Sequence, residues 1–388
     1  MRSPRPSFQR LALLGATGSI GRQVCDLVER HPERFALHAV IGGSDAAGLQ
    51  AVTRRHGEAH ALLAHPLDGD AEGAARAINE VVCDPDVDLV VVAIAGSAAL
   101  GPTLAALEAG KNIALATKEV LVMAGPLVRE SMRQHGSQIF PIDSEHSAIW
   151  QCLWGEKREA VRRLVLTGSG GPFLRRPLET MDRVTIAEVL AHPRWKMGPK
   201  ITVDSATMMN KGLEIIEAHF LFDVAYADID VVIHPESVVH SMVEFVDGSV
   251  KAQLGLPDMH LPIAIALGYP ERIPDLTTAP DLAVLGRLTF EPLDGARYPA
   301  VDLAREAGEK GGTAPAILNA ANEEAVALFL NGQCRFVDVI DAVRGVLDAA
   351  VPVETMTLES VIAADGWARA QVRTRISGSP HIRSKLPA

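Results

Sequence analysis

The sequence contains little cysteine, and none of it is arranged in a pattern that indicates a structural role. The four cysteines, Cys25, Cys83, Cys152 and Cys334, are scattered, with no CxxC pair and no Cys/His cluster. Neither a zinc site nor a disulfide framework is therefore indicated.

Net positive charge and long apolar runs are also lacking. The net charge of −11 argues against nucleic acid or an anionic membrane as the main partner. No apolar stretch reaches membrane-spanning length, and Leu11–Leu14, which follows the basic N-terminus, is too short for a signal-peptide core. We therefore expect a cytoplasmic protein. Internal repeats and low-complexity tracts are absent.

The first third of the chain alternates apolar strand runs with helical runs, which is typical of a parallel sheet. The expected strands span 10–15, 35–41, 60–64, 88–95, 112–117 and 138–142, with helices between them such as 20–30 and 98–109. Near-continuous apolar strands such as Leu89–Ile94 imply cover on both faces of the sheet. We predict an α/β domain over residues 1–143.

The rest of the chain changes character twice. Residues 144–275 combine strands at 163–167, 230–234, 241–246 and 249–254 with helices at 184–191, 205–222 and 260–267, which predicts a central α+β domain. Within it, the glycine-rich and proline-rich start of residues 169–199 is typical of a lid or binding loop. A linker at 276–299 precedes a C-terminal helical bundle at 300–388, with helices at 300–310, 314–330, 336–349 and 358–377.

Three glycines follow the first strand in Gly15-Ala-Thr-Gly18-Ser-Ile-Gly21. Glycines at a strand–helix turn allow close approach of the backbone to a pyrophosphate at the helix N-terminus, so we predict a Rossmann-like dinucleotide site. A tight turn without a ligand is the alternative. No acid stands directly at the end of the second strand, Val40-Ile-Gly-Gly-Ser-Asp45, which weakly favours a 2′-phosphorylated cofactor.

Two carboxylates, Asp143 and Glu145, follow the last strand of the first domain. If the strand stays extended, both point to one side at its carboxyl end. Paired carboxylates repel unless a proton or cation lies between them, and a hard divalent cation is the natural partner. The alternative is an ordinary helix start with Ser144 as the cap.

A lysine, Lys118, follows the strand at 112–117, where it either polarises a carbonyl or is simply solvated at a helix start. In the stretch 204–217, helical spacing places Asn210, Lys211 and Glu214 within about 100° of one another. Ser205, Asn210 and Lys211 suit a phosphate, and Glu214 suits a metal.

An amphipathic helix would explain most of this stretch, with Glu217 merely solvated. It explains Gly212 badly, because a mid-helix glycine costs ~1 kcal/mol. Of the four nearby histidines, His146, His234 and His240 are each better explained as structural. His192, inside the expected lid, is equally compatible with a structural and a functional role.

Together these stretches resemble the 1-deoxy-D-xylulose 5-phosphate reductoisomerase family nearly end to end. The similarity rests on the glycine motif, Lys118-Glu119, Asp143-Ser-Glu145-His, Leu166-Thr-Gly-Ser-Gly-Gly-Pro-Phe173, His192-Pro-Arg-Trp-Lys-Met-Gly198, Val203-Asp-Ser-Ala-Thr-Met-Met-Asn-Lys-Gly-Leu-Glu214 and Ile233-His-Pro-Glu-Ser-Val-Val-His240. The resemblance implies a homodimer that uses NADPH and Mg²⁺ or Mn²⁺, with Co²⁺ as a further option, to rearrange and reduce a sugar phosphate.

The resemblance also implies residue roles. The metal ligands would be Asp143, Glu145 and Glu214. The catalytic residues would be Lys118, Glu145, His192 and Glu214. The substrate would be bound by Lys118, Ser144, Glu145, Ser169, His192, Ser205, Asn210, Lys211 and Glu214. The NADPH site would be lined by Thr17, Gly18, Ser19, Ile20, Gly43, Thr117, Glu119 and Gly198. Trp195 would cover the closed site.

Two departures from the family pattern touch the cofactor site: Gly42-Gly43-Ser44-Asp45 stands for the usual Ala-Gly-Lys-Asn, and Thr117-Lys-Glu-Val120 for Asn-Lys-Glu-Ser. One rival interpretation is a homoserine- or semialdehyde-dehydrogenase-like enzyme, the latter requiring a nucleophilic cysteine. The other is an NADP-binding regulatory protein with a dead site, which should have lost a metal or phosphate ligand. All those ligands are present.

Overall fold

The structure is a computed structural model that describes residues 8–57, 59–65, 69–191, 197–274 and 276–378. These residues form two compact units. The first unit combines the described residues within 1–120, 128–147 and 258–278, and the second combines those within 121–127, 148–257 and 279–388. The predicted domain boundaries at 143, 275 and 299 stay predictions.

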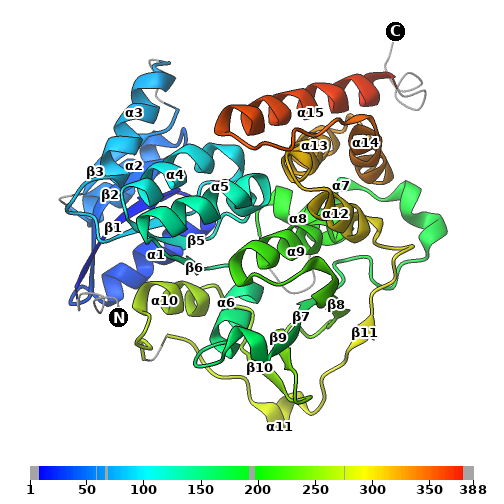
Figure 1. Cartoon of the computed structure of the whole chain (residues 1–388), viewed down its shortest axis with the longest axis horizontal. Helices are drawn as coiled ribbons and strands as arrows, with labels where there is room; N and C mark the ends of the chain where they lie inside the picture. Colours follow the sequence, from blue (N-terminus) through cyan, green and yellow to red (C-terminus); the bar gives the residue numbers. More distant parts are fainter. Residues whose placement is uncertain (1–7, 58, 66–68, 192–196, 275, 379–388) are drawn as a thin grey trace. The chain divides into compact units, whose positions relative to one another are not determined.

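The first unit is built on a six-stranded sheet whose strands are all parallel, in the order β3-β2-β1-β4-β5-β6. It is drawn in blue to teal in Figure 1, with helices α1 to α5 beside the strands. Its elements are β1 (Gln9–Leu14), α1 (Ser19–Arg30), β2 (Phe35–Gly42), α2 (Ala46–Arg55), β3 (His60–Leu63), α3 (Ala71–Val82), β4 (Leu89–Val92), α4 (Leu100–Glu108), β5 (Asn112–Leu115), α5 (Glu119–His135) apart from its residues 121–127, β6 (Ile139–Pro141) and the start of α6 (Ser144–Cys152).

This strand order predicts where a ligand binds. The order reverses between β1 and β4, and open parallel sheets bind ligands beyond the carboxyl ends of the strands at such a point. All four residues of β4 are buried, as the apolar run predicted. Helix α10 (His260–Gly268) comes much later in the chain but packs against α1, β5 and β6, and Gln9 Nε2 donates to the carbonyl of Leu267 at 3.0 Å.

The second unit contains a five-stranded mixed sheet in the order β10-β9-β7-β8-β11 and a set of helices. Its sheet strands are β7 (Val161–Gly168), β8 (Ile229–Ile233), β9 (Val239–Phe245), β10 (Val250–Leu254) and β11 (Glu291–Pro292). Its helices include α7 (Ile186–Leu190), α8 (Pro199–Thr207), α9 (Met209–Phe222), α11 (Leu282–Leu285), α12 (Pro299–Lys310), α13 (Ala314–Leu330), α14 (Phe336–Ala349) and α15 (Leu358–Gly378). One hydrophobic core continues from β7 through α9 into the bundle α12–α15.

The prediction of a single helix over 205–222 is wrong. The chain ends α8 at Thr207, passes through Met208 with φ of 60°, and begins α9 at Met209. The Thr207 hydroxyl accepts the Met209 N–H at 3.2 Å, which helps to hold the break. Neither glycine nor proline marks this position, so the sequence carries no ordinary breaker signal.

Gly212, which sequence reasoning left poorly explained, lies where α9 packs against α12. A Cβ at this position would approach the Ala304 Cβ to 2.5 Å and the Ala300 carbonyl oxygen to 3.1 Å. The glycine is therefore required by close helix–helix packing, and this contact offsets its low helix propensity.

Candidate active site

The turn between β1 and α1 holds the three glycines predicted to bind a dinucleotide. Gly15 has φ of 95°, and a Cβ there would lie 2.3 Å from the Ala93 carbonyl oxygen. A Cβ at Gly21 would lie 2.1 Å from the Gly15 carbonyl oxygen. The first and third glycines are thus fixed by packing. Gly18 is exposed at the N-cap of α1, and no described side chain caps that helix. The helix N-terminus therefore fits a pyrophosphate.

The other expected cofactor residues are spread over both units. Thr17 precedes α1, Ser19 and Ile20 begin it, Gly43 follows β2 and Glu119 begins α5, all in the first unit. Thr117 is buried, and its hydroxyl donates to the Ile94 carbonyl at 2.6 Å, so it braces the end of β4. Gly198 is the N-cap of α8, in the second unit.

The unusual Asp45 caps its own helix. Its Oδ1 accepts the Gly48 N–H at 2.8 Å at the start of α2. Arg55, at the far end of α2, lies 3.3 Å from a Glu29 carboxylate oxygen. The carboxylate of Asp45 is therefore used to cap α2, and the positive charge of Arg55 is paired with Glu29.

Asp143 and Glu145 come together as predicted, but for a different geometric reason. A carboxylate oxygen of each lies within 4.8 Å of the other. The strand β6 ends at Pro141 and α6 begins at Ser144, so the expected extended strand is wrong. A strand–helix junction brings the two acids together: Asp143 precedes the helix, and Glu145 lies in its first turn. The Ser144 hydroxyl donates to Glu145 Oε2 at 2.5 Å, and Ser144 belongs to the helix itself.

Lys118 lies beside these acids. It is 6% exposed, and its Nζ is 2.5 Å from Asp143 Oδ2. β5 and β6 are parallel neighbours, which places Lys118 and Asp143 at the same edge of the sheet. The alternative of a solvated lysine is therefore wrong. The donor set of two carboxylates is all oxygen, as a hard divalent cation requires.

In the second unit, Asn210, Lys211 and Glu214 lie on one side of α9, as their spacing predicted. The Asn210 amide and the Lys211 ammonium both donate to the Glu214 carboxylate. Lys211 and Glu214 are almost completely buried. Glu217, one turn further on, is fully buried too, so its description as merely solvated is wrong.

The glycine loop after β7, defined as Gly168–Gly171, lies beside this helix pair. A Cβ at Gly168 would be 3.3 Å from Lys211 Cε, and one at Gly171 would be 2.7 Å from the Ser205 carbonyl oxygen. Ser169 accepts the Gly171 N–H at 3.2 Å. The loop, the end of α8 and the start of α9 therefore bring the four expected phosphate ligands into one neighbourhood of the second unit.

Of the histidines singled out in the sequence, the structure gives a clear role to His234. His192 and Trp195 lie outside the described residues. His234 is fully buried, and its Nε2 accepts the N–H groups of Val238 and Val239 at 3.1 Å each. This arrangement places the ring proton on Nδ1, which lies 2.8 Å from the Thr289 carbonyl oxygen. His234 therefore shapes the β8–β9 connection, as the structural interpretation predicted.

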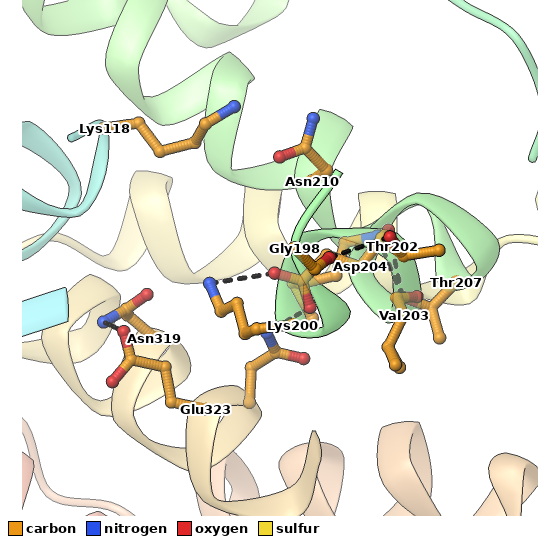
Figure 2. Close-up of polar contacts among 12 residues, drawn as sticks. Lys118, Gly198, Lys200, Thr202, Val203, Asp204, Thr207, Asn210, Asn319 and Glu323 are labelled. Atoms are coloured by element: carbon orange, nitrogen blue, oxygen red, sulfur yellow. Dashed lines mark hydrogen bonds and ion pairs between the residues drawn. The ribbon is translucent and has the colours of Figure 1, made fainter. Parts of the chain in front are cut away.

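Sequence reasoning gave no role to Asp204, which is 1% exposed on α8. Its carboxylate lies 2.8 Å from Lys200 Nζ (Figure 2). It also accepts a hydrogen bond from Asn322 Nδ2 at 2.8 Å. The i,i+4 spacing of Lys200 and Asp204 could have indicated the ion pair. The partner on α13 carries no local signal, because 118 residues separate it from Asp204.

The cysteines show no activation as nucleophiles. Burial raises the pKa of the Cys152 and Cys25 thiols to about 11 and that of Cys334 to about 12, and it also raises the pKa of Cys83. A thiol with a raised pKa is a poor source of thiolate at neutral pH. This counts against the semialdehyde-dehydrogenase alternative.

Three models of one protein family match the chain. The 1-deoxy-D-xylulose 5-phosphate reductoisomerase model matches residues 11–125, the C-terminal domain model of that enzyme matches 139–222, and the DXP reductoisomerase C-terminal domain model matches 254–371. Among the described residues, none of the helices has the length and apolar character of a membrane-spanning segment.

Individual relatives agree with the family models. The 1-deoxy-D-xylulose 5-phosphate reductoisomerase of Thermomicrobium roseum is 48% identical over 371 residues, covering 94% of this chain and 96% of the relative. The Zymomonas mobilis enzyme, solved in complex with NADPH, superposes with a TM-score of 0.88 at 40% identity, covering 96% of this chain and 100% of that one. A DOX-P reductoisomerase solved with NADPH, fosmidomycin and magnesium gives 0.88 at 40% identity, with 95% and 98% coverage. This chain belongs to the 1-deoxy-D-xylulose 5-phosphate reductoisomerase family.

Proposed function

We propose which residues of this chain carry out the reaction of its family. The chain is an NADP-dependent oxidoreductase that converts 1-deoxy-D-xylulose 5-phosphate to 2-C-methyl-D-erythritol 4-phosphate in isoprenoid precursor synthesis, using NADPH and a divalent metal ion. The residue assignments below rest on the contacts within each unit and on the match of the chain to the family motifs.

The metal site is proposed at Asp143, Glu145 and Glu214. The observation that carries it is the pair of carboxylate oxygens of Asp143 and Glu145 within 4.8 Å, next to Lys118. Glu214 comes from the second unit and adds a third carboxylate, which is buried. Mg²⁺ is the expected ion, and Mn²⁺ and Co²⁺ are alternatives with the same preference for oxygen ligands. A cation held there would polarise a carbonyl oxygen of the substrate.

The lysines and hydroxyls bind and orient the substrate. Lys118 sits at the carboxylate pair and is proposed to hold a substrate oxygen, together with Ser144. Ser169, Ser205, Asn210 and Lys211 are proposed to bind the phosphate, with Lys211 supplying the charge. Phosphate binding gives energy remote from the reacting carbons, which is used to order the site and exclude water. His192 is assigned through the family motif, and the lid at 169–199 through the glycine-rich and proline-rich start of that segment.

The cofactor is proposed to lie along the turn Thr17–Ile20, with Gly43, Thr117, Glu119 and Gly198 along the rest of its length. The helix α1 N-terminus would hold the pyrophosphate, and bound NADPH would supply hydride. Thr117 would act indirectly, because its hydroxyl donates to the Ile94 carbonyl and so holds the segment that follows β4.

The decisive experiment follows NADPH consumption with 1-deoxy-D-xylulose 5-phosphate. We expect turnover with Mg²⁺, loss of turnover on chelation with EDTA, and recovery when Mg²⁺ is restored. The matched control is 1-deoxy-D-xylulose without the phosphate, which should be a much poorer substrate. Turnover that persists after chelation, or equal use of the two sugars, would contradict the proposed site.

A homodimeric state and a cytoplasmic location are further proposals, supported by the resemblance of the chain to its family. Size-exclusion chromatography with light scattering tests the first, and a monomer at micromolar concentration would contradict it. Fractionation of cells that express the tagged chain tests the second.

A further inference from the structure

The break between α8 and α9 separates the proposed phosphate ligands into two groups. Ser205 lies in the last turn of α8, whereas Asn210 and Lys211 lie in the first turn of α9. Met208 between them has φ of 60°, a left-handed conformation that is unfavourable for a residue other than glycine. The surrounding structure must therefore hold each helix in place.

The two helices are held by different means. On the α9 side, Gly212 packs closely against Ala300 and Ala304 of α12, which is an apolar contact. On the α8 side, the contact is polar. Asp204 accepts a hydrogen bond from Asn322 of α13. Lys200, one turn earlier on α8, pairs with the same carboxylate (Figure 2). Asp204 and Asn322 are both buried.

A buried charge is a poor means of adding stability, because desolvation offsets much of its attraction. It is better suited to fixing geometry, since each partner has a defined direction. Here the hydrogen bond sets the rotation and height of the last turn of α8 against α13. Ser205 follows Asp204 directly and takes its position from the same turn.

We propose that Asp204, held by Asn322 and Lys200, is a positioning residue that fixes Ser205 for binding the substrate phosphate. In this proposal the network affects phosphate binding through Ser205, which it positions from the same turn of α8. This inference rests on the proposed role of Ser205 in phosphate binding.

The test compares Asn322→Ala with Asn319→Ala. Asn319 lies one turn earlier on α13, is equally buried, and donates to Glu323 of its own helix at 3.2 Å. Both changes remove a buried amide, so both should lower the melting temperature. Only Asn322→Ala should raise KM for 1-deoxy-D-xylulose 5-phosphate, by about tenfold, with kcat within a few-fold of wild type. It should also weaken the thermal protection given by inorganic phosphate.

Two further variants keep the test decisive. Lys200→Met changes a partly exposed position and should raise KM in the same direction if Asn322→Ala fails to fold. The exchange Asp204→Asn with Asn322→Asp reverses donor and acceptor and should restore much of the lost phosphate protection. An equal KM in Asn322→Ala and Asn319→Ala, or an unchanged KM in Lys200→Met, would overturn the inference.

Ser205→Ala separates this inference from the assignment beneath it. If Ser205→Ala weakens phosphate binding and Asn322→Ala does not, the positioning role is wrong and the phosphate site stands. If Ser205→Ala leaves KM and phosphate protection unchanged, the phosphate assignment is wrong and the positioning role is overturned with it.

Discussion

The two units present their candidate chemistry in different ways. In the first, Lys118 and Asp143 meet because β5 and β6 are parallel neighbours and both side chains follow a strand end. In the second, Lys211 and Glu214 meet because they are three residues apart on one helix. Each unit thus pairs a proposed substrate lysine with a proposed metal carboxylate, one pair through sheet topology and the other through helix periodicity.

The difference shows how strongly each pair depends on the rest of the fold. A pair on one helix needs only that the helix forms, because i and i+3 side chains lie on one face. A pair at two strand ends needs the strand order, the register and both turns. We therefore expect substitutions around Lys118 and Asp143 to affect geometry more widely than substitutions on α9.

The largest effect should come from the carboxylates. Glu214→Gln and Asp143→Asn should each lower kcat roughly a thousandfold at limiting Mg²⁺, because a catalytic metal supplies several kcal/mol to the transition state. Glu324→Gln is the control, since Glu324 pairs with an exposed arginine, Arg373, on the bundle surface. Kinetics across a Mg²⁺ titration measure the effect. Near-wild-type turnover of Glu214→Gln with metal limiting would leave the first unit alone as the metal site.

Substitution of the two proposed substrate lysines, one in each unit, should change different kinetic parameters. Lys211→Met should raise KM for the phosphorylated substrate by about ten- to a hundredfold, because a charged hydrogen bond contributes ~1.5–3 kcal/mol. Lys118→Met should mainly lower kcat, since Lys118 lies at the carboxylate pair. Steady-state kinetics of both variants measure the split. The division of roles is wrong if the two substitutions change the same parameter.

A smaller effect is expected at the cofactor end of the first unit. Ser44 and Asp45 stand where the family usually has lysine and asparagine. NADPH should therefore still be preferred over NADH, but by a smaller factor than in a chain that carries the lysine. Ser44→Lys with Asp45→Asn should widen the ratio of kcat/KM values about tenfold. Asparagine caps helices as well as aspartate, so α2 should stay intact.

The control for this change is Asp45→Asn alone, which keeps the cap but adds no positive charge. If the double variant leaves the cofactor ratio unchanged, Ser44 and Asp45 do not face the 2′-phosphate. Better use of NADH than of NADPH by the natural chain would contradict the predicted preference for NADPH.

The bounds of the helices in the C-terminal bundle were predicted more accurately than the break between α8 and α9. Helices Ala314–Leu330 and Phe336–Ala349 were predicted at both ends, because their apolar periodicity is regular. The break at Met208 was missed, since the contacts that hold it come from the Thr207 hydroxyl and from helix packing outside its own segment.

In the candidate site, too, local arrangements were predicted from the sequence and contacts between distant residues were not. The spacing of Asn210, Lys211 and Glu214 gave their shared face directly, and the strand-end rule gave Asp143. It did not give the pairing of Asp143 with Lys118, or that of Asp204 with Asn322, because partners 25 and 118 residues away depend on the whole fold.

The smallest expected effect concerns the glycine loop of the second unit. Tyr298 is 2% exposed, and its hydroxyl donates to the Gly170 carbonyl at 2.7 Å. Burial raises the pKa of Tyr298 to about 12, so the hydroxyl keeps its proton at neutral pH and remains a donor. Tyr298→Phe would leave the buried Gly170 carbonyl without this donor, at a cost of about 1–3 kcal/mol. We expect lower stability and a KM for the sugar phosphate that rises a few-fold, because Ser169 belongs to the same loop.

Tyr226→Phe is the matched control for Tyr298→Phe. Tyr226 is also buried in the second unit, but its hydroxyl meets no hydrogen-bond partner among the described residues. Removing that hydroxyl should leave KM unchanged and stability equal or higher, since a buried unpaired hydroxyl is itself unfavourable. Thermal unfolding and steady-state kinetics of the two variants give the comparison. Equal KM values would show that the loop keeps its shape without Tyr298. The close packing of Gly171 against the Ser205 carbonyl would then be sufficient to hold Ser169 in place.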